Sequence, residues 1–260
     1  LDVNEPPSLS VDIAEIAENT PGAVLGTITV TDPDEGASVA LAVDDPRFEV
    51  GDFLKLRAGI ALNHEDAAEV PLTITATDGG LSVEFSVSVP VSDVNEPPTG
   101  IVLSANSVNE NVVDIDIGNL TVIDPDESET HGLSVADNRF DIVDDKLRLI
   151  GSIDFESEPT VEIIVSATDA EGLFRSEVIV IAIVNVNEAP VFIGGEFQVD
   201  ENVLGVDIGS IPVLDVDFGS VLEFESDDSR FTIENGILRL ADGIGLDHEA
   251  DSSITLSLQV

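Results

Sequence analysis

The sequence predicts an all-β protein built of tandem β-sandwiches, and three observations lead to this prediction. Apolar and polar residues alternate with a period of two, turn-forming Pro, Gly, Asn and Asp separate the short apolar runs, and one unit of about 91 residues occurs three times. A period of two is typical of strands that bury one face. No segment of comparable length has a convincing helical period.

The alternation is clearest in one strand of each unit, where every second residue is apolar. These residues are Val70, Leu72, Ile74 and Ala76, then Val161, Ile163, Val165 and Ala167, then Ile254, Leu256, Leu258 and Val260. An earlier strand carries Leu25, Ile28 and Val30, and its counterparts carry Ile117, Leu120 and Val122, and Ile208, Ile211 and Val213. A Gly within this strand, at 26, 118 and 209, predicts a bulge or bend. Phe48, Phe140 and Phe231 are interpreted as core residues.

The repeat also sets the predicted domain boundaries. DVNEPP occurs at Asp2–Pro7 and Asp93–Pro98, and NVNEAP occurs at Asn185–Pro190. We predict repeat one with its linker at 1–96, repeat two with its linker at 97–188, and repeat three at 189–260. Roughly seven short strands per unit predict a sandwich of immunoglobulin-like architecture. Repeat three stops where its Ala-x-Asp motif should begin, so we expect it to be truncated before its last strand.

Composition excludes several partner classes. The chain has 53 acidic and 9 basic residues and a net charge of -44, so nucleic acid and anionic membrane surfaces are not expected to bind it. Its 43% hydrophobic content is too high for a disordered acidic tail. No apolar run approaches the roughly 20 residues of a membrane span, so no membrane insertion of this segment is expected.

Acidic residues recur at five stations in each unit. The stations are a Glu-Asn pair, an Asp-x-Asp, a mid-repeat Asn-x-Glu or Asp-x-Glu, an Ala-x-Asp, and the Asn-Glu of the linker. A single Asp-Pro-Asp is more often a turn than a ligand. Ca²⁺ takes 6 to 8 oxygen ligands, so several acids must come together to bind it, and five stations repeated in register favour a calcium site.

These motifs together resemble the cadherin repeat, over nearly all of the chain. The resemblance implies seven-stranded Greek-key sandwiches arranged end to end in an elongated rod, with Ca²⁺ held between successive repeats. For the first junction it implies the ligands Glu18, Asn63, Glu65, Asp93, Asn95, Glu96, Asp124, Asp126 and Asp169. For the second it implies Glu110, Asp154, Glu156, Asn185, Asn187, Glu188, Asp215 and Asp217, and for the start of repeat one it implies Asn4, Asp32, Asp34 and Asp78.

Some residues depart from the family pattern. Asn63 stands where the family usually has Asp, Asn185 replaces the leading Asp of the linker, and the linker is one residue shorter than usual. The short linker, its Val at the second position and the absence of Cys and Trp look more like cadherin-like repeats of large bacterial surface proteins than like animal adhesion receptors.

Catalysis is not expected. His64-Glu65 and His248-Glu249 lack the second His of a zinc-protease motif, and Phe155 stands at the equivalent place in repeat two. Paired carboxylates could serve a glycosidase, but the chain has no Trp or Tyr to form a sugar platform.

Two function classes remain open. The first is a calcium-rigidified extracellular segment of a cell-surface adhesion or spacer protein, whose partner would be another cell-surface protein, bound homophilically or heterophilically. The second is a calcium-dependent carbohydrate-binding module with a polysaccharide partner. The scarcity of aromatic residues favours the first.

Overall fold

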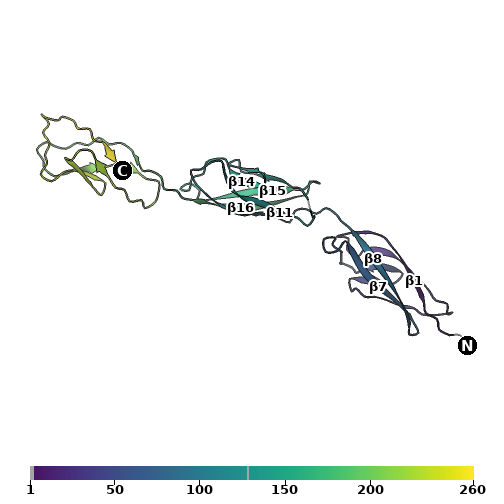
Figure 1. Cartoon of the computed structure of the whole chain (residues 1–260). Coiled ribbons are helices and arrows are strands. Elements are labelled where there is room, and N and C mark those ends of the chain that lie inside the picture. Colours follow the sequence, from purple (N-terminus) through teal and green to yellow (C-terminus); the bar gives the residue numbers. More distant parts are fainter. Residues whose placement is uncertain (1–2, 128) are drawn as a thin grey trace. The chain divides into compact units, whose positions relative to one another are not determined.

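The computed structural model describes residues 3–127 and 129–260, so Asp2 of the first DVNEPP motif lies outside the described residues. Every regular element in these residues is a β-strand, as the alternating sequence predicted (Figure 1). The described chain contains no helix with the length and apolar character that a membrane crossing requires.

Repeat one forms two four-stranded sheets, ordered β1-β3-β6-β5 and β2-β8-β7-β4. Its strands are β1 (Ser8–Ile13), β2 (Ile16–Ala17), β3 (Val24–Thr31), β4 (Ala40–Val43), β5 (Phe48–Val50), β6 (Phe53–Leu56), β7 (Glu69–Asp78) and β8 (Leu81–Ser92).

Repeat two has the same order of strands, β9-β11-β14-β13 in one sheet and β10-β16-β15-β12 in the other. These strands are β9 (Gly100–Leu103), β10 (Ser107–Asn109), β11 (Ile115–Ile123), β12 (Gly132–Val135), β13 (Phe140–Val143), β14 (Lys146–Leu149), β15 (Thr160–Thr168) and β16 (Phe174–Val184).

The first strand of each of these two repeats is split between the sheets, which the sequence did not predict. In repeat one, β1 pairs antiparallel with β3, and β2 then pairs parallel with β8. In repeat two, β10 pairs parallel with β16 in the same way. Two short pieces therefore take the place of one of the seven predicted strands.

The inward faces of the long strands form the cores, as predicted. In β7, Val70, Leu72, Ile74 and Ala76 are all buried, and so are the four corresponding residues of β15. Phe48 is fully buried, and Phe140 and Phe231 are buried in their own repeats. Burying a side chain of this size stabilises a fold by about 1.5–3 kcal/mol.

The predicted bulges are present at all three glycines. The register of the ladder shifts between Val24 and Gly26, between Asp116 and Gly118, and between Asp207 and Gly209. A Cβ atom on Gly26 would lie 2.0 Å from the backbone oxygen of Asp12 on β1, so only glycine lets the two backbones approach this closely.

We therefore expect Gly26→Ala to destabilise repeat one by about 1–3 kcal/mol, since the added methyl group must push β1 away from β3. Urea unfolding followed by circular dichroism would measure the change. Gly51→Ala is the matched control, because no atom lies within 4 Å of a Cβ at Gly51. Equal losses from the two variants would contradict this role of Gly26.

Repeat three is less regular than the sequence predicted. Its strands are β17 (Val191–Phe192), β18 (Asp207–Ser210), β19 (Val213–Leu214), β20 (Glu225–Ser226), β21 (Phe231–Glu234), β22 (Ile237–Leu240) and β23 (Leu258–Gln259). The predicted strand from Ile254 to Val260 is reduced to β23. Its counterpart β7 is paired by β4 and β8, whereas β23 is paired by β20 alone among the described residues, so fewer ladder hydrogen bonds hold it extended.

Contacts divide the chain into two compact units, and the division runs through repeat two. The first unit contains the described residues up to Val102 with Leu120–Ser134 and Val165–Glu177, and the second contains Leu103–Asn119, Val135–Ile164 and Val178–Val260. Each linker therefore lies inside a compact unit. The repeat boundaries drawn from the sequence stay a prediction.

Candidate metal centre

A buried glutamate anchors the start of each linker. Glu18 is 2% exposed, and its Oε2 and Oε1 accept hydrogen bonds from the backbone N–H groups of His64 (2.8 Å) and Val94 (2.9 Å). Glu110 is 1% exposed and accepts in the same way from Phe155 and Val186, both at 2.8 Å. Charge-assisted bonds of this kind are the stronger class, so each glutamate fixes the linker to its own repeat.

An aspartate holds the other end of each linker. The backbone N–H of Glu96 donates to Asp126 Oδ2 at 2.8 Å, and that of Glu188 donates to Asp217 Oδ2 at 2.6 Å. Within both Asp-x-Asp motifs the backbone N–H of the second Asp donates to the carboxylate of the first Asp, and this bond fixes a tight turn. The linker glutamate is thereby held beside the carboxylates of the following repeat.

The predicted acids gather into groups in which one carboxylate oxygen from each residue lies within 4.8 Å of those from the others. At the first junction these groups are Glu18, Glu65 and Asp93, and Glu65, Glu96 and Asp126. Glu65 belongs to both, so its carboxylate joins them into one cluster. The second junction has Glu110, Glu156 and Glu188, and the start of repeat one has Asp32, Asp34 and Asp78.

The start of repeat one has the same contact between an Asn-Glu and an Asp-x-Asp that each linker makes with the following repeat. The N–H of Glu5 donates to Asp34 Oδ2 at 2.9 Å, as the N–H of Glu96 does to Asp126. Asn4 packs against Gly79, where a Cβ atom would lie 3.0 Å from Asn4 Oδ1. Asp78 is 8% exposed and completes the group with the Asp-x-Asp turn.

Burial and mutual repulsion raise the pKa values of several acids at the two junctions. Burial, followed by the nearby carboxylates, raises the pKa of Glu96 and that of Asp126 above their ordinary values. The same two causes raise the pKa of Glu156 and that of Glu188 at the second junction. Carboxylates packed in this way resist ionisation unless a cation joins them.

Asp169 closes the first junction from repeat two. Burial acts to raise its pKa, but hydrogen bonds from the Asn95 side chain and from the backbone of Leu173, Gly172 and Glu171 outweigh this and hold the pKa below its usual value. Asn95 Nδ2 lies 2.9 Å from Asp169 Oδ2. The amide of the first linker therefore reaches the Ala-x-Asp of the next repeat.

Several oxygens of these groups have no hydrogen-bond partner and almost no solvent contact. They are Asp32 Oδ2, Asn95 Oδ1, Glu96 Oε2 and Glu188 Oε2. Burying such atoms unpaired is costly, and a bound cation would satisfy them. The donors at the junctions are carboxylate and amide oxygens, so they fit the hard cation Ca²⁺.

Other predicted ligands make hydrogen bonds to nearby residues of the chain or to another acid of the same junction. Asn63 Oδ1 accepts from the backbone of Asp66, and Asp154 accepts from Ser157 Oγ at 2.6 Å, so both cap turns. Asn185 donates to Glu156 Oε1 at 3.1 Å, and Asn187 donates to the backbone oxygen of Glu188. Asp215 supplies the turn that positions Asp217.

Sequence reasoning missed the two asparagines that follow the buried glutamates. Asn19 and Asn111 have φ angles of 56° and 58°, and their side-chain amides donate to the linker residues Glu96 and Glu188. Asparagine tolerates this left-handed conformation better than most residues. The recurrence of Glu-Asn was the available signal, but only its Glu was assigned a role.

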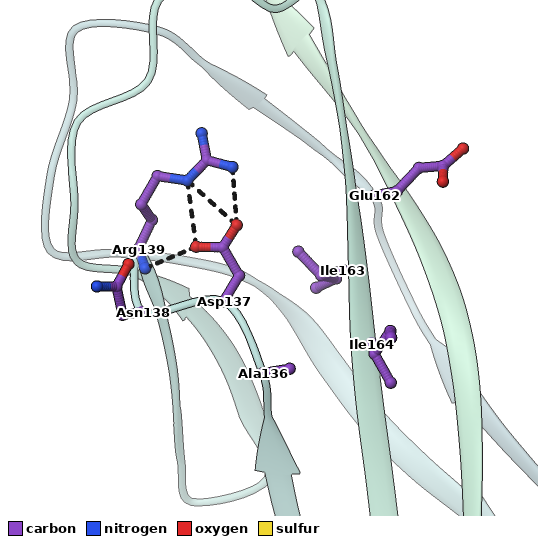
Figure 2. Close-up of a pocket in the computed structure, with 7 residues that line it drawn as sticks. All are labelled: Ala136, Asp137, Asn138, Arg139, Glu162, Ile163 and Ile164. Atoms are coloured by element: carbon purple, nitrogen blue, oxygen red, sulfur yellow. Dashed lines mark hydrogen bonds and ion pairs between the residues drawn. The ribbon is translucent and has the colours of Figure 1, made fainter.

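A second recurrent motif, Asp-x-Arg-Phe, lies away from the linkers. Figure 2 shows its copy in repeat two, where two side-chain nitrogens of Arg139 donate hydrogen bonds to the carboxylate of Asp137. Glu158 also bonds this arginine at 2.6 Å. The arginine side chain holds the pKa of Asp137 below its usual value.

An open hollow of about 570 Å³ lies beside the motif, bounded by Ala136–Arg139 and by Glu162–Ile164. The bonds between Arg139 and Asp137 are those of a structural ion pair, and the same pair occurs at Arg47 and Arg230.

Comparison with known proteins identifies the architecture. Protocadherin beta-1 of Homo sapiens is 32% identical over 145 residues, which cover 50% of this chain and 18% of that protein. Protocadherin Fat 4 of Homo sapiens is 31% identical over 218 residues, covering 74% of this chain and 4% of that protein. No protein-family model matches the chain.

A solved structure has the same fold over nearly the whole chain. Protocadherin Gamma B2 extracellular cadherin domains 1-5 match with a TM-score of 0.65 and 24% identity, over 99% of this chain and 57% of that one. The chain thus spans only part of each relative. Both relatives named above are human proteins, and they give no support to a bacterial origin. The chain therefore has the fold of tandem cadherin-like repeats and is similar in sequence to protocadherins.

Proposed function

We propose that this segment binds Ca²⁺ at its linkers and that the bound ions stiffen it as an adhesion or spacer part of a cell-surface protein. The observation that supports this most is the arrangement found at both linkers. A buried glutamate and an aspartate hold each linker from its two ends, beside carboxylates that have buried oxygens without partners. Cations would neutralise these groups and join the linker to both neighbouring repeats.

The proposed role is binding rather than catalysis, and its partner would be another cell-surface protein, bound homophilically or heterophilically. A polysaccharide partner is the alternative, and a glycan array with and without chelator would separate the two. Calcium-dependent glycan binding would favour the carbohydrate-binding module. The placement in a bacterial surface protein stays a prediction from the linker and the composition.

Asp126→Asn tests the proposed calcium ligands. Asparagine keeps an oxygen to accept the N–H of Glu96 but removes a charge, so we expect calcium affinity at the first junction to fall by about tenfold or more. Calorimetric titration of the whole chain would measure it. Glu84→Gln is the matched control, since Glu84 is exposed on β8. Equal effects would mean that general surface charge binds the ion.

Asn185→Asp tests the difference between the junctions. The ligand sets inferred from the sequence contain seven carboxylates at the first junction and six at the second, where Asn185 replaces the Asp found at position 93. We expect the variant to bind calcium more tightly at the second junction, by about tenfold, because affinity follows ligand charge.

Without calcium, Asn185→Asp should loosen this linker, because a carboxylate at position 185 would repel Glu156 where Asn185 now donates a hydrogen bond. Amide exchange of 185–188 in chelator would measure the loosening. Asp93→Asn is the reciprocal variant and should weaken calcium binding at the first junction. If calcium affinity is unchanged in both variants, the first residue of each linker, at positions 93 and 185, is not a calcium ligand.

A further inference from the structure

A histidine lies among the carboxylates of the first junction, and its surroundings are not those of a calcium ligand. His131 Nε2 donates to Asp124 Oδ2 at 2.7 Å, and the side chains of His131 and Asp124 are 12% and 4% exposed. Ligand atoms of Asp124, Glu129 and His131 all lie within 4.8 Å of one another. Neither Glu129 nor His131 is among the ligands that the cadherin resemblance implies.

Glu129 gives an independent indication that a cation is needed at this place. Its Oε2 atom has almost no accessible surface and no hydrogen-bond partner. The acids Asp126, Asp124 and Asp169 lie near the Glu129 carboxylate. A hydrogen bond from His131 to Asp124 would explain the histidine alone, but it leaves the Glu129 oxygen unsatisfied.

The other repeats show that the fold itself does not require these two residues. Counted from the first Asp of each Asp-x-Asp, Glu129 corresponds to Ala37 in repeat one and Ser220 in repeat three. His131 corresponds to Val39 and Leu222. Two metal-binding side chains have therefore been placed together in one of three copies of the same loop.

We propose that Asp124, Glu129 and His131 form a site for a divalent transition metal such as Zn²⁺. Ca²⁺ is bound through oxygen, whereas an imidazole with two carboxylates suits Zn²⁺ and Co²⁺. Metal–ligand bonds to nitrogen and oxygen of about 2.0–2.2 Å would replace the direct bond between His131 and Asp124. Three protein ligands leave a fourth position for water.

Co²⁺ titration of the whole chain without added calcium, repeated in millimolar calcium, tests this inference, because Asp124 also belongs to the ligand set of the first junction. We expect one equivalent of Co²⁺ to produce visible d–d absorption that Zn²⁺ abolishes by competition. His131→Gln should lower the affinity by about tenfold or more, and Glu129→Gln should also lower it. His248→Gln, which removes a histidine from repeat three, should change nothing.

The inference is overturned if no stoichiometric Co²⁺ binding occurs, or if His131→Gln leaves it unchanged. The radius of gyration of each variant, measured with and without calcium, separates this site from the proposed function. Loss of Co²⁺ binding with an intact calcium response would count against the transition-metal site alone. Co²⁺ binding in a chain that does not respond to calcium would count against the calcium-stiffened linkers alone.

Discussion

Removal of calcium is expected to loosen both linkers while the β-sandwiches stay folded. Within each junction group, one carboxylate oxygen from each residue lies within 4.8 Å of the others. Each pair of like charges at about 4 Å costs roughly 1–4 kcal/mol, depending on solvent exposure. The core around Phe48 is built of apolar side chains such as Leu25, Leu54 and Ile74, so it should not respond.

Small-angle scattering of the whole chain in chelator should give a smaller radius of gyration, because repeats joined by flexible linkers bend and are on average less extended than a stiff chain. Far-ultraviolet circular dichroism should stay the same. An unchanged radius would contradict the calcium-stiffened linker. Magnesium at the same ionic strength is the control, because it demands an octahedral geometry and gives up its water reluctantly.

The loosened state should also depend on pH. The pKa values of Glu96, Asp126, Glu156 and Glu188 are raised, mainly by burial. The cost of ionising these groups is therefore fully present above their raised pKa values and is lost as the pH falls through them. In chelator, mild acidification should therefore reverse part of the change in the radius of gyration that calcium removal causes.

Glu18→Ala is expected to be the most damaging single substitution at the first junction. The variant loses a buried carboxylate and leaves the N–H groups of His64 and Val94 without acceptors. Each unpaired buried group costs about 1–3 kcal/mol, so we expect a loss of about 2–5 kcal/mol even without calcium. Glu110→Ala should act in the same way at the second junction.

Hydrogen exchange of the amides of His64 and Val94 would measure the loss at the two groups concerned. Glu201→Ala is the matched control, because Glu201 is the exposed counterpart in repeat three and accepts a hydrogen bond from His248 at 3.2 Å. If exchange at Val94 is as slow in Glu18→Ala as in the native chain, the glutamate does not anchor the linker.

The fold was predictable where one face of a strand is buried along its whole length. Val70, Leu72, Ile74 and Ala76 alternate because β7 packs one face on the core. Gly26 marked the bulge of β3 because no side chain fits there. The split first strand was not predictable. Its second piece in repeat one is only Ile16–Ala17, and two residues carry no period.

The candidate site was predictable as far as repetition revealed it. Glu18 and Asp126 stood out because Glu110 and Asp217 return at the same places. Asn19 did not, since an asparagine beside a turn needs no ligand role to explain it. His131 and Glu129 occur in one repeat only, and the loop that brings them to Asp124 is visible only in three dimensions.

The split first strand determines how each repeat would carry a mechanical load. The chain enters repeat two through β9 and then β10, and it leaves through β16. Strands β10 and β16 run parallel, pairing Ser107 with Ala182, Val108 with Ile183 and Asn109 with Val184. Tension applied at the two ends pulls parallel neighbours in opposite directions along their length. Their hydrogen bonds are then sheared together instead of being peeled apart one at a time. In repeat one, β2 and β8 have two such pairs, Ile16 with Val91 and Ala17 with Ser92. Under tension this two-pair contact should therefore break before the three-pair contact of repeat two.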